Sequence, residues 1–208
     1  MGTLNERTIP SMLAAGKAAN EAGVPVVFDP VGVGASTLRN HTAARILDDV
    51  KIAVLRGNIS EVRFLAGIAS QTKGVDASES DLQGGDAAVS VAKPLAARLG
   101  CVVAITGTVD VVSDGVKTVC SQNGHPRLSA ITGTGCMCSS LMGSFCGAVP
   151  DRLLEATVSA LLTMGIAGEL AEEHAGHGGN GSFRAALHDT VSRMDADTIR
   201  RRAKLYEA

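Results

Sequence analysis

Aromatic residues are scarce in this sequence: its 208 residues include four phenylalanines, one tyrosine and no tryptophan. Apolar residues still make up 45% of the chain. A core must therefore be built from alanine, valine, leucine, isoleucine and methionine. Glycine is abundant instead, with 24 copies, which indicates many tight turns and places where the backbone approaches a ligand closely.

Charge of either sign is not in excess, because the formal net charge is only −2. The sequence therefore lacks the electrostatic signature of a protein that binds nucleic acid or an anionic membrane. Glycine, serine and charged residues interrupt the apolar stretches before they reach the length of a membrane span, and residues 1–6 do not resemble a signal peptide. We expect a soluble protein. The five cysteines lack disulfide-like spacing, which favours a reducing cytoplasm.

Short apolar runs alternate with helical patterns along the first half of the chain. The runs lie at residues 24–28, 52–55 and 101–105, and the helical patterns at residues 6–21, 38–49, 60–66 and 86–99. A continuous apolar run is typical of a parallel strand that is covered on both faces, whereas a strand exposed on one face alternates. The order of elements therefore predicts helices on both sides of a sheet.

The pattern changes after the third apolar run. Asp114-Gly115 lies between two β-rich runs within residues 110–119, which is a strong hairpin signal. A polar, glycine-rich loop is expected at residues 70–85, and from Thr134 onward the pattern is helical, interrupted at residues 176–181. The sequence predicts one α/β domain over residues 1–208: a three-layer α/β/α sandwich with a mainly parallel central sheet and an antiparallel hairpin at one edge.

Polar or glycine-containing segments follow each predicted parallel strand, at residues 29–32, 56–58 and 106–107. The carboxyl ends of parallel strands meet at the same edge of a sheet, and ligands bind beyond that edge. The three segments are therefore predicted to form one site.

The segment from Thr132 to Ser140 places the pair Gly133 and Gly135 before a helix of small residues. The free amides and the positive potential of a helix N-terminus make such a turn an anion cradle. Cys136 falls in the first helical turn, where the same field favours the thiolate. The structural alternative is a glycine-rich helix cap followed by a buried, inert cysteine.

Three charged residues near strand ends are further candidates. Arg56 ends the second strand, and Glu61 follows about one helical turn after the strand end, which suits a phosphate contact and a ligand of Mg²⁺ or of its waters. Asn58 and Glu61 also match a capping box, which needs no ligand. Asp29 ends the first strand and could instead be solvated or cap the next turn.

Together these segments resemble the hydroxyethylthiazole kinase family of the ribokinase-like superfamily. The matching stretches are residues 26–35, 55–58 with Glu61, 73–76, 104–107 with Val109 and Asp110, 132–136 and 181–183. Ribokinase-like proteins usually carry an aspartate as base after the glycine pair, and Cys136 at this position narrows the choice.

The resemblance implies transfer of the γ-phosphate of ATP, with Mg²⁺, to the primary alcohol of 4-methyl-5-(2-hydroxyethyl)thiazole. It implies that Arg56 and Thr106 contact ATP, that Gly133 lies against the thiazole, and that Cys136 is catalytic. Thr134 and Gly135 would complete the phosphate cradle. Glu61 would hold Mg²⁺ or its waters, with Asp29 nearby. The resemblance also implies a homotrimer with active sites at subunit interfaces.

The family normally has further chain before the segment that matches Met1–Leu4, on the order of 60 residues at ~30 per βα unit. We therefore expect the nucleotide side of the site to be present and the acceptor side to be incomplete. Two alternatives stay open: a hydroxymethylpyrimidine (phosphate) kinase, which also has a cysteine after Gly-Thr-Gly, and a non-catalytic nucleotide-binding remnant. Neither the pair His174 and His177 nor the pair Cys136 and Cys138 predicts a metal site.

Overall fold

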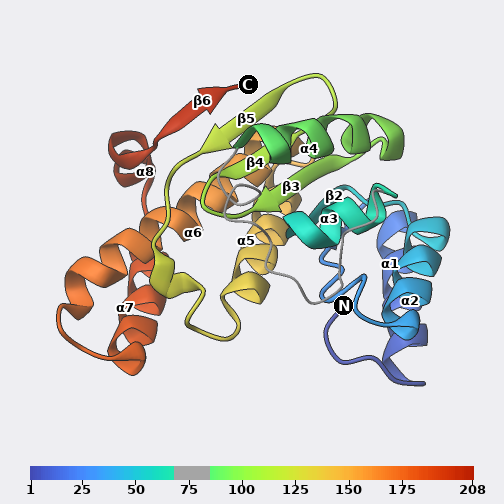
Figure 1. The fold of residues 1–208 in the computed structure, drawn as a ribbon, viewed down its shortest axis with the longest axis horizontal. Helices are drawn as coiled ribbons and strands as arrows, with labels where there is room; N and C mark the ends of the chain where they lie inside the picture. Colours follow the sequence, from blue (N-terminus) through green and yellow to red (C-terminus); the bar gives the residue numbers. More distant parts are fainter. Residues whose placement is uncertain (68–84) are drawn as a thin grey trace.

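A computed structural model describes residues 1–67 and 85–208. The helices are α1 (Thr8–Glu21), α2 (Thr37–Asp49), α3 (Ile59–Leu65), α4 (Gly85–Leu99), α5 (Thr134–Ala148), α6 (Leu153–Ala175), α7 (Asn180–Arg193), α8 (Ala196–Arg202) and the 3-10 turn η2 (Pro126–Leu128). The strands are β1 (Val27–Phe28), β2 (Val54–Asn58), β3 (Val102–Thr106), β4 (Asp110–Ser113), β5 (Thr118–Ser121) and β6 (Leu205–Glu207). They form one sheet in the order of the sequence (Figure 1).

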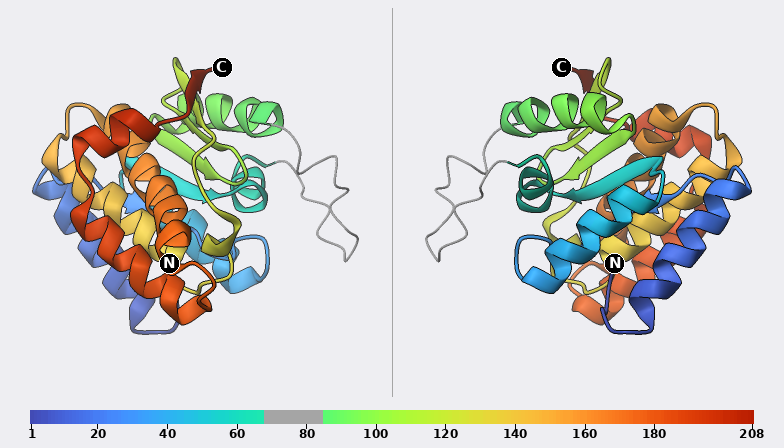
Figure 2. Two further views of the ribbon diagram at one scale, coloured as in Figure 1. Left: turned by 90° about the vertical axis from the view of Figure 1, so that its left-hand side faces the viewer. Right: turned by 90° about the vertical axis from the view of Figure 1, so that its right-hand side faces the viewer.

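The strands separate two apolar clusters because successive side chains point to opposite faces of the sheet. Leu55, Val103 and Ile105 pack with residues of α1 to α4 on one face. Val54 and Ala104 pack with residues of α5, α6 and α7 on the other. The predicted three layers are therefore confirmed, and Figure 2 shows α3 and α4 on one side of the strands and α5, α6 and α7 on the other.

The parallel part of the sheet comprises β1, β2 and β3, with Val54 opposite Val27 on one side and Val102 on the other. The pairs β3–β4, β4–β5 and β5–β6 are antiparallel. The described sheet is thus more mixed than the sequence predicts, because β6 joins the edge of the hairpin. All three residues of β6 are exposed, so the sequence has no pattern of buried apolar residues from which this short strand could be predicted.

The predicted hairpin is confirmed, and residues 114–117, which begin with Asp114 and Gly115, form its turn. The Asp114 carboxylate accepts hydrogen bonds from the N–H groups of Val116 and Lys117, each at 2.8 Å. Gly115 has φ of 93°, which side-chain-bearing residues rarely adopt. The polar loop expected at residues 70–85 lies outside the described residues except for Gly85, and so does the matching stretch 73–76.

Helix α6 is the central helix of its layer. Among the described residues it is the one helix long and apolar enough to cross a membrane, but 72% of its most apolar window is buried inside the fold. A core helix of a soluble protein shows this burial. Glycines let a chain segment approach α6 closely: a Cβ on Gly165 would lie 2.8 Å from the Asn123 carbonyl oxygen, and one on Gly168 would lie 2.7 Å from Leu128.

We predict that Gly165→Ala destabilises the fold by about 1–3 kcal/mol, because the added methyl group meets a backbone carbonyl that cannot move cheaply. Gly143→Ala, at a partly exposed position of α5 with nothing within 4 Å of the added Cβ, is the matched control. It should raise stability by about 0.5–1 kcal/mol through helix propensity. Urea unfolding of both variants measures the difference, and equal effects at the two positions would contradict the close approach.

Candidate functional site

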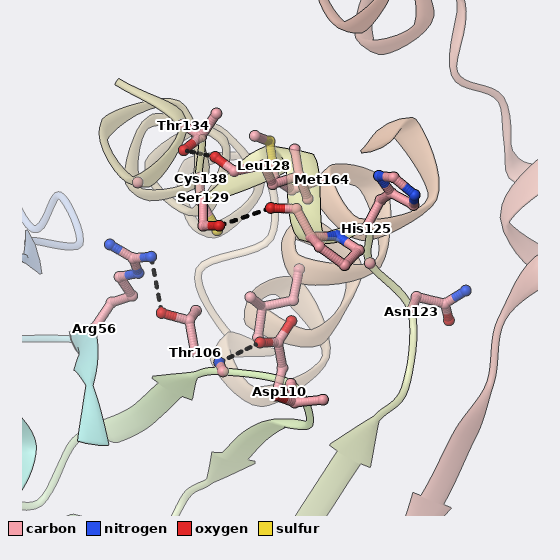
Figure 3. Close-up of a pocket in the computed structure, with 17 residues that line it drawn as sticks. Arg56, Thr106, Asp110, Asn123, His125, Leu128, Ser129, Thr134, Cys138 and Met164 are labelled. Atoms are coloured by element: carbon pink, nitrogen blue, oxygen red, sulfur yellow. Dashed lines mark hydrogen bonds between the residues drawn. The ribbon is translucent and has the colours of Figure 1, made fainter. Parts of the chain in front are cut away.

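A cavity of about 490 Å³ opens beyond the carboxyl ends of β2 and β3 (Figure 3). Its lining includes four of the residues predicted from the sequence, namely Arg56, Thr106, Thr134 and Gly135. Thr106 is the last residue of β3, and Thr134 and Gly135 belong to the first turn of α5. Arg56 is the middle residue of β2, because this strand continues to Asn58 instead of ending at Arg56 as predicted. The structure therefore brings the strand-end segments and the anion cradle to one place, as the topology predicts.

Arg56 is the cation at the centre of this arrangement. Its Nη1 donates to Asp29 Oδ2 at 3.0 Å, and its Nη2 donates to Thr106 Oγ1 at 2.8 Å. The side chain is only 14% exposed. A Cβ on Gly135 would lie 2.9 Å from Arg56 Nη1, so only glycine lets the first turn of α5 lie this close to the guanidinium.

Asp29 is held by two donors on the same oxygen. Besides Arg56, the hydroxyl of Ser139 donates to Asp29 Oδ2 at 2.8 Å. The carboxylate is 12% exposed, and its Oδ1 is buried without a hydrogen-bond partner among the described residues. Asp29 is thus neither solvated nor a cap of the next turn; it joins β1, β2 and α5. Ser139 was not predicted as a site residue.

Glu61 uses both carboxylate oxygens on backbone amides. Oε2 accepts from the N–H of Asn58 at 2.9 Å, and the Asn58 side chain accepts from the N–H of Glu61, which completes the capping box of α3. Oε1 accepts from the N–H of Gly32 at 2.8 Å. The capping-box alternative is therefore confirmed, and Glu61 also fixes the loop that follows Asp29.

The first turn of α5 has the geometry expected of a cradle. Gly133 precedes the helix with φ of 101°, and the first backbone bond of the helix runs from the N–H of Met137 to Gly133. The amides of residues 134 to 136 thus precede the hydrogen-bond ladder. Cys136 is exposed, so the alternative of a buried, inert cysteine is wrong for it. The neighbouring Cys138 is buried, and this burial raises the pKa of its thiol to about 12.

Gly133 and Cys136 flank the cradle but do not line the cavity, and neither Asp29 nor Glu61 lines it. Asp29 stands behind Arg56 and Glu61 braces the neighbouring loop. Some of the predicted residues therefore line the cavity, whereas others, such as Asp29 and Glu61, support the residues and loops beside it.

Asp110 is a cavity residue to which the sequence assigned no role of its own. It begins β4, and its Oδ1 accepts a hydrogen bond of 3.0 Å from the N–H of Gly107, in the turn after β3. Burial raises the pKa of this carboxyl to about 7, against the opposing effects of the Gly107 N–H and the Arg56 charge. The negative charge beside Arg56 therefore varies with pH near neutrality. The sequence feature that could have indicated Asp110 is its position four residues after the end of β3.

The far wall of the cavity combines an apolar surface with a polar rim. Leu128, Leu161 and Met164 form the apolar part, and the more exposed His125 and Ser129 form the polar rim. Such a mixture is typical of a small-molecule site. The side chain of the buried Asn123 points away from the cavity (Figure 3) and bonds to Glu169 instead.

Arg127 anchors the segment that carries this rim. Its Nη1 lies 2.6 Å from Glu172 Oε2, its Nη2 donates to the Gly178 carbonyl at 2.8 Å, and its guanidinium lies 4.8 Å from the centre of the Phe183 ring. The pattern of residues 123–129 gave no signal for this anchor, because its partners are some 45 to 56 positions away in the sequence.

The comparisons with known proteins agree with one another. The model of the hydroxyethylthiazole kinase family matches residues 1–197. A hydroxyethylthiazole kinase of Ruminiclostridium cellulolyticum is 56% identical over 207 residues, which cover 100% of this chain and 75% of that protein. One from Clostridium beijerinckii is 53% identical with the same coverage.

The solved structures point the same way. A hydroxyethylthiazole kinase structure from Pyrococcus horikoshii is 39% identical, has a TM-score of 0.86 and covers 100% of this chain and 74% of its own. A pyridoxal kinase of Bacillus subtilis is 22% identical with a TM-score of 0.54, over 76% of this chain and 59% of its own, and shares the fold alone. The predicted ribokinase-like fold class is thereby confirmed.

We predict that Glu61→Gln lowers the free energy of unfolding by about 0.5–1.5 kcal/mol. A glutamine has one acceptor oxygen, so its NH₂ group must face the N–H of either the exposed Asn58 or the partly buried Gly32, and one of these two hydrogen bonds is lost. Glu155→Gln, which changes a 57% exposed carboxylate, is the control and should alter stability little. A stable Glu61→Gln protein in chemical denaturation would contradict the bracing role.

Proposed function

The chain belongs to the hydroxyethylthiazole kinase family, and from this membership we propose that it transfers the γ-phosphate of ATP to the hydroxyl of 4-methyl-5-(2-hydroxyethyl)thiazole, in thiamine biosynthesis or salvage. The observation that carries the proposal is the cavity in which Arg56 of β2 faces the first turn of α5. The family assignment favours this reading over a hydroxymethylpyrimidine kinase and over a non-catalytic remnant.

The nucleotide side of the site is assigned to Arg56 and Thr106. Phosphoryl transfer depends mainly on positioning and charge neutralisation. A guanidinium held by two side-chain partners presents its remaining N–H groups in a fixed direction, which suits phosphate oxygens. The adjoining apolar wall of Leu128, Leu161 and Met164 offers a surface for the base of the nucleotide.

The acceptor side is assigned to the start of α5. Amides of residues 133 to 136 would stabilise the phosphoryl group in transit, because they point away from the helix and carry its positive potential. Gly133 would lie against the thiazole. Cys136, exposed in the first turn, would accept the proton of the substrate hydroxyl as that oxygen attacks phosphorus.

Magnesium is part of the proposal. Among residues 1–67 and 85–208 no three His, Cys, Asp or Glu side chains gather as a metal site. The arrangement still fits Mg²⁺, which is usually held by one or two carboxylates, waters and substrate phosphates. Asp29 would hold it through the unpartnered Oδ1, and Glu61 would act only through waters, since both of its oxygens serve amides. The bound ion would neutralise charge on the leaving phosphates.

The remaining expectations also belong to the proposal. The protein would act in the cytoplasm as a homotrimer whose sites lie at subunit interfaces, as the resemblance implies, and residues 1–208 would form one ribokinase-like domain. Light scattering at several protein concentrations tests the trimer.

The proposed activity is tested by comparing turnover on the thiazole alcohol and on hydroxymethylpyrimidine, with ATP and Mg²⁺. The protein should be produced with all residues that its reading frame encodes. We expect phosphorylation of the thiazole alcohol at least tenfold faster than that of the pyrimidine. Faster phosphorylation of the pyrimidine, or ATP binding without transfer to either alcohol, would overturn the proposal.

We predict that Arg56→Ala weakens ATP binding by about 1.5–3 kcal/mol, because one charge-assisted contact to phosphate is lost. The affinity for the thiazole alcohol should change much less. Arg45→Ala, which removes a 62% exposed arginine, is the control. Calorimetric titration measures the affinity for both ligands. Far-ultraviolet circular dichroism and thermal unfolding check the fold, because Arg56→Ala also leaves Asp29 buried without its cation. Unchanged ATP affinity in a folded variant would remove Arg56 from the nucleotide site.

We predict that Cys136→Ala lowers turnover roughly 10²- to 10⁴-fold, which is the usual contribution of a general base, with little change in ATP affinity. Cys136→Asp should retain substantial activity, since a carboxylate at this position can also accept the proton. Cys146→Ala, at a buried cysteine of the same helix, is the control for loss of a thiol. Steady-state kinetics decide, and an alanine variant as fast as the parent would exclude the catalytic role.

A further inference from the structure

Helix α5 carries three serines whose hydroxyl groups make different contacts. Ser140 and Ser144 donate to the carbonyl oxygens four residues earlier, at 2.9 and 3.0 Å, and both are exposed. This local bond is the ordinary behaviour of a serine within a helix. The Ser139 hydroxyl lies 3.2 Å from the corresponding carbonyl of Gly135 but only 2.8 Å from Asp29 Oδ2.

The single proton of Ser139 is best donated to Asp29. A hydroxyl has one proton to give, and bonds to a charged acceptor are shorter and stronger than bonds to a carbonyl. The Asp29 acceptor is also the closer of the two. Ser139 therefore makes a contact between elements rather than a bond within α5, and it joins positions that are 110 residues apart in the chain.

The same carboxylate oxygen receives Arg56 Nη1 at 3.0 Å. Asp29 Oδ2 thus accepts hydrogen bonds both from Arg56 of β2 and from Ser139 of α5. The backbone of the first turn of α5 lies against the other side of the contact, since a Cβ on Gly135 would come within 2.9 Å of Arg56 Nη1. Ser139 and Gly135 lie one helical turn apart, so the two contacts fix the distance and the rotation of α5 relative to the guanidinium.

We propose that Ser139 is a positioning residue for phosphoryl transfer: by donating to Asp29 it sets the first turn of α5, with Cys136 and the amide cradle, against Arg56. This inference rests on the proposed function. Transfer requires the attacking oxygen and the phosphorus to be aligned, and a displacement of about 1 Å can cost a hundredfold in rate. Arg56 would place the phosphates and α5 would place the acceptor, so the Ser139–Asp29 bond governs alignment rather than the binding of either substrate.

The test compares Ser139→Ala with Ser144→Ala, a serine on the same helix that bonds only to its own backbone. We expect kcat of Ser139→Ala to fall about tenfold while KM for both substrates and the calorimetric Kd for ATP stay within about twofold. Ser144→Ala should match the parent protein. Ser139→Thr, which keeps a hydroxyl, should restore kcat to within about threefold.

A double-mutant cycle with Asp29→Asn separates this role from a general loss of stability. In the Asp29→Asn background the further change Ser139→Ala should lower kcat by a clearly smaller factor than in the parent protein, because a neutral amide oxygen accepts a weaker hydrogen bond than a carboxylate does. Equal kcat for Ser139→Ala and Ser144→Ala would overturn the inference, as would an undiminished effect in the Asp29→Asn background. If Ser139→Ala does not fold, a Ser139→Thr protein with kcat as low as that of Asp29→Asn would overturn it.

These outcomes are distinct from failure of the proposed function. If the parent protein binds ATP but phosphorylates neither alcohol, the proposed function fails. If the parent protein phosphorylates the thiazole alcohol and the two serine variants do not differ, only the role of Ser139 fails.

Discussion

The ion pair between Arg56 and Asp29 is the constraint on which the site depends. Both side chains are largely buried, at 14% and 12% exposed, and removing two charges from water costs several kcal/mol each unless geometry and additional hydrogen bonds compensate. Thr106 supplies one such bond to Arg56, and Ser139 supplies one to Asp29. The pair is therefore tolerable only where the ends of β1, β2 and β3 meet the start of α5. A change in any of these elements would expose or orphan a charge.

The composition explains how these elements come so close. Few aromatic side chains are available to fill the interior, so helices approach the sheet and each other through small residues. Gly135 admits the guanidinium against α5, and Gly165 admits the Asn123 carbonyl against α6. The cavity is bounded by backbone at these positions, and its shape is consequently stiff. A larger side chain at either position would displace a cavity wall rather than fill a void.

Local patterns predicted the elements well where the apolar signal was strong. The buried runs near Val54 and Val103 and the Asp114-Gly115 turn are all in place. Parallel topology then predicted that Asp29, Arg56 and Thr106 would meet, because their strands end at one edge. Sequence reasoning could not choose between the two roles of Glu61, since a capping box and a magnesium ligand require the same residue.

The parts that escaped prediction depend on contacts between distant segments. From the sequence alone, Ser139 looks like an ordinary helical serine, and its bond to Asp29 exists only because α5 packs beside the end of β1. Arg127 likewise looks like a surface arginine, and only the fold brings Glu172 and Phe183 to it. Asp110 begins a strand, and its effect on the site follows from burial rather than from its neighbours in the sequence. The exposed strand β6 has no pattern at all. In each case the physical cause is tertiary.

The arrangement of Arg56 also bears on how it can hold a phosphate without releasing its partners. A guanidinium has five N–H donors, and one bond each from Nη1 and Nη2 to Asp29 and Thr106 uses two of them. The Nε–H is buried without an acceptor among the described residues. A buried donor without a partner costs about 1–3 kcal/mol, so an oxygen anion that reaches it recovers this cost on binding. The two side-chain bonds can then remain as the brace that keeps the arginine aimed. If Arg56 binds the nucleotide as proposed, Asp29 would assist by orienting the cation, although its charge opposes that of the phosphates.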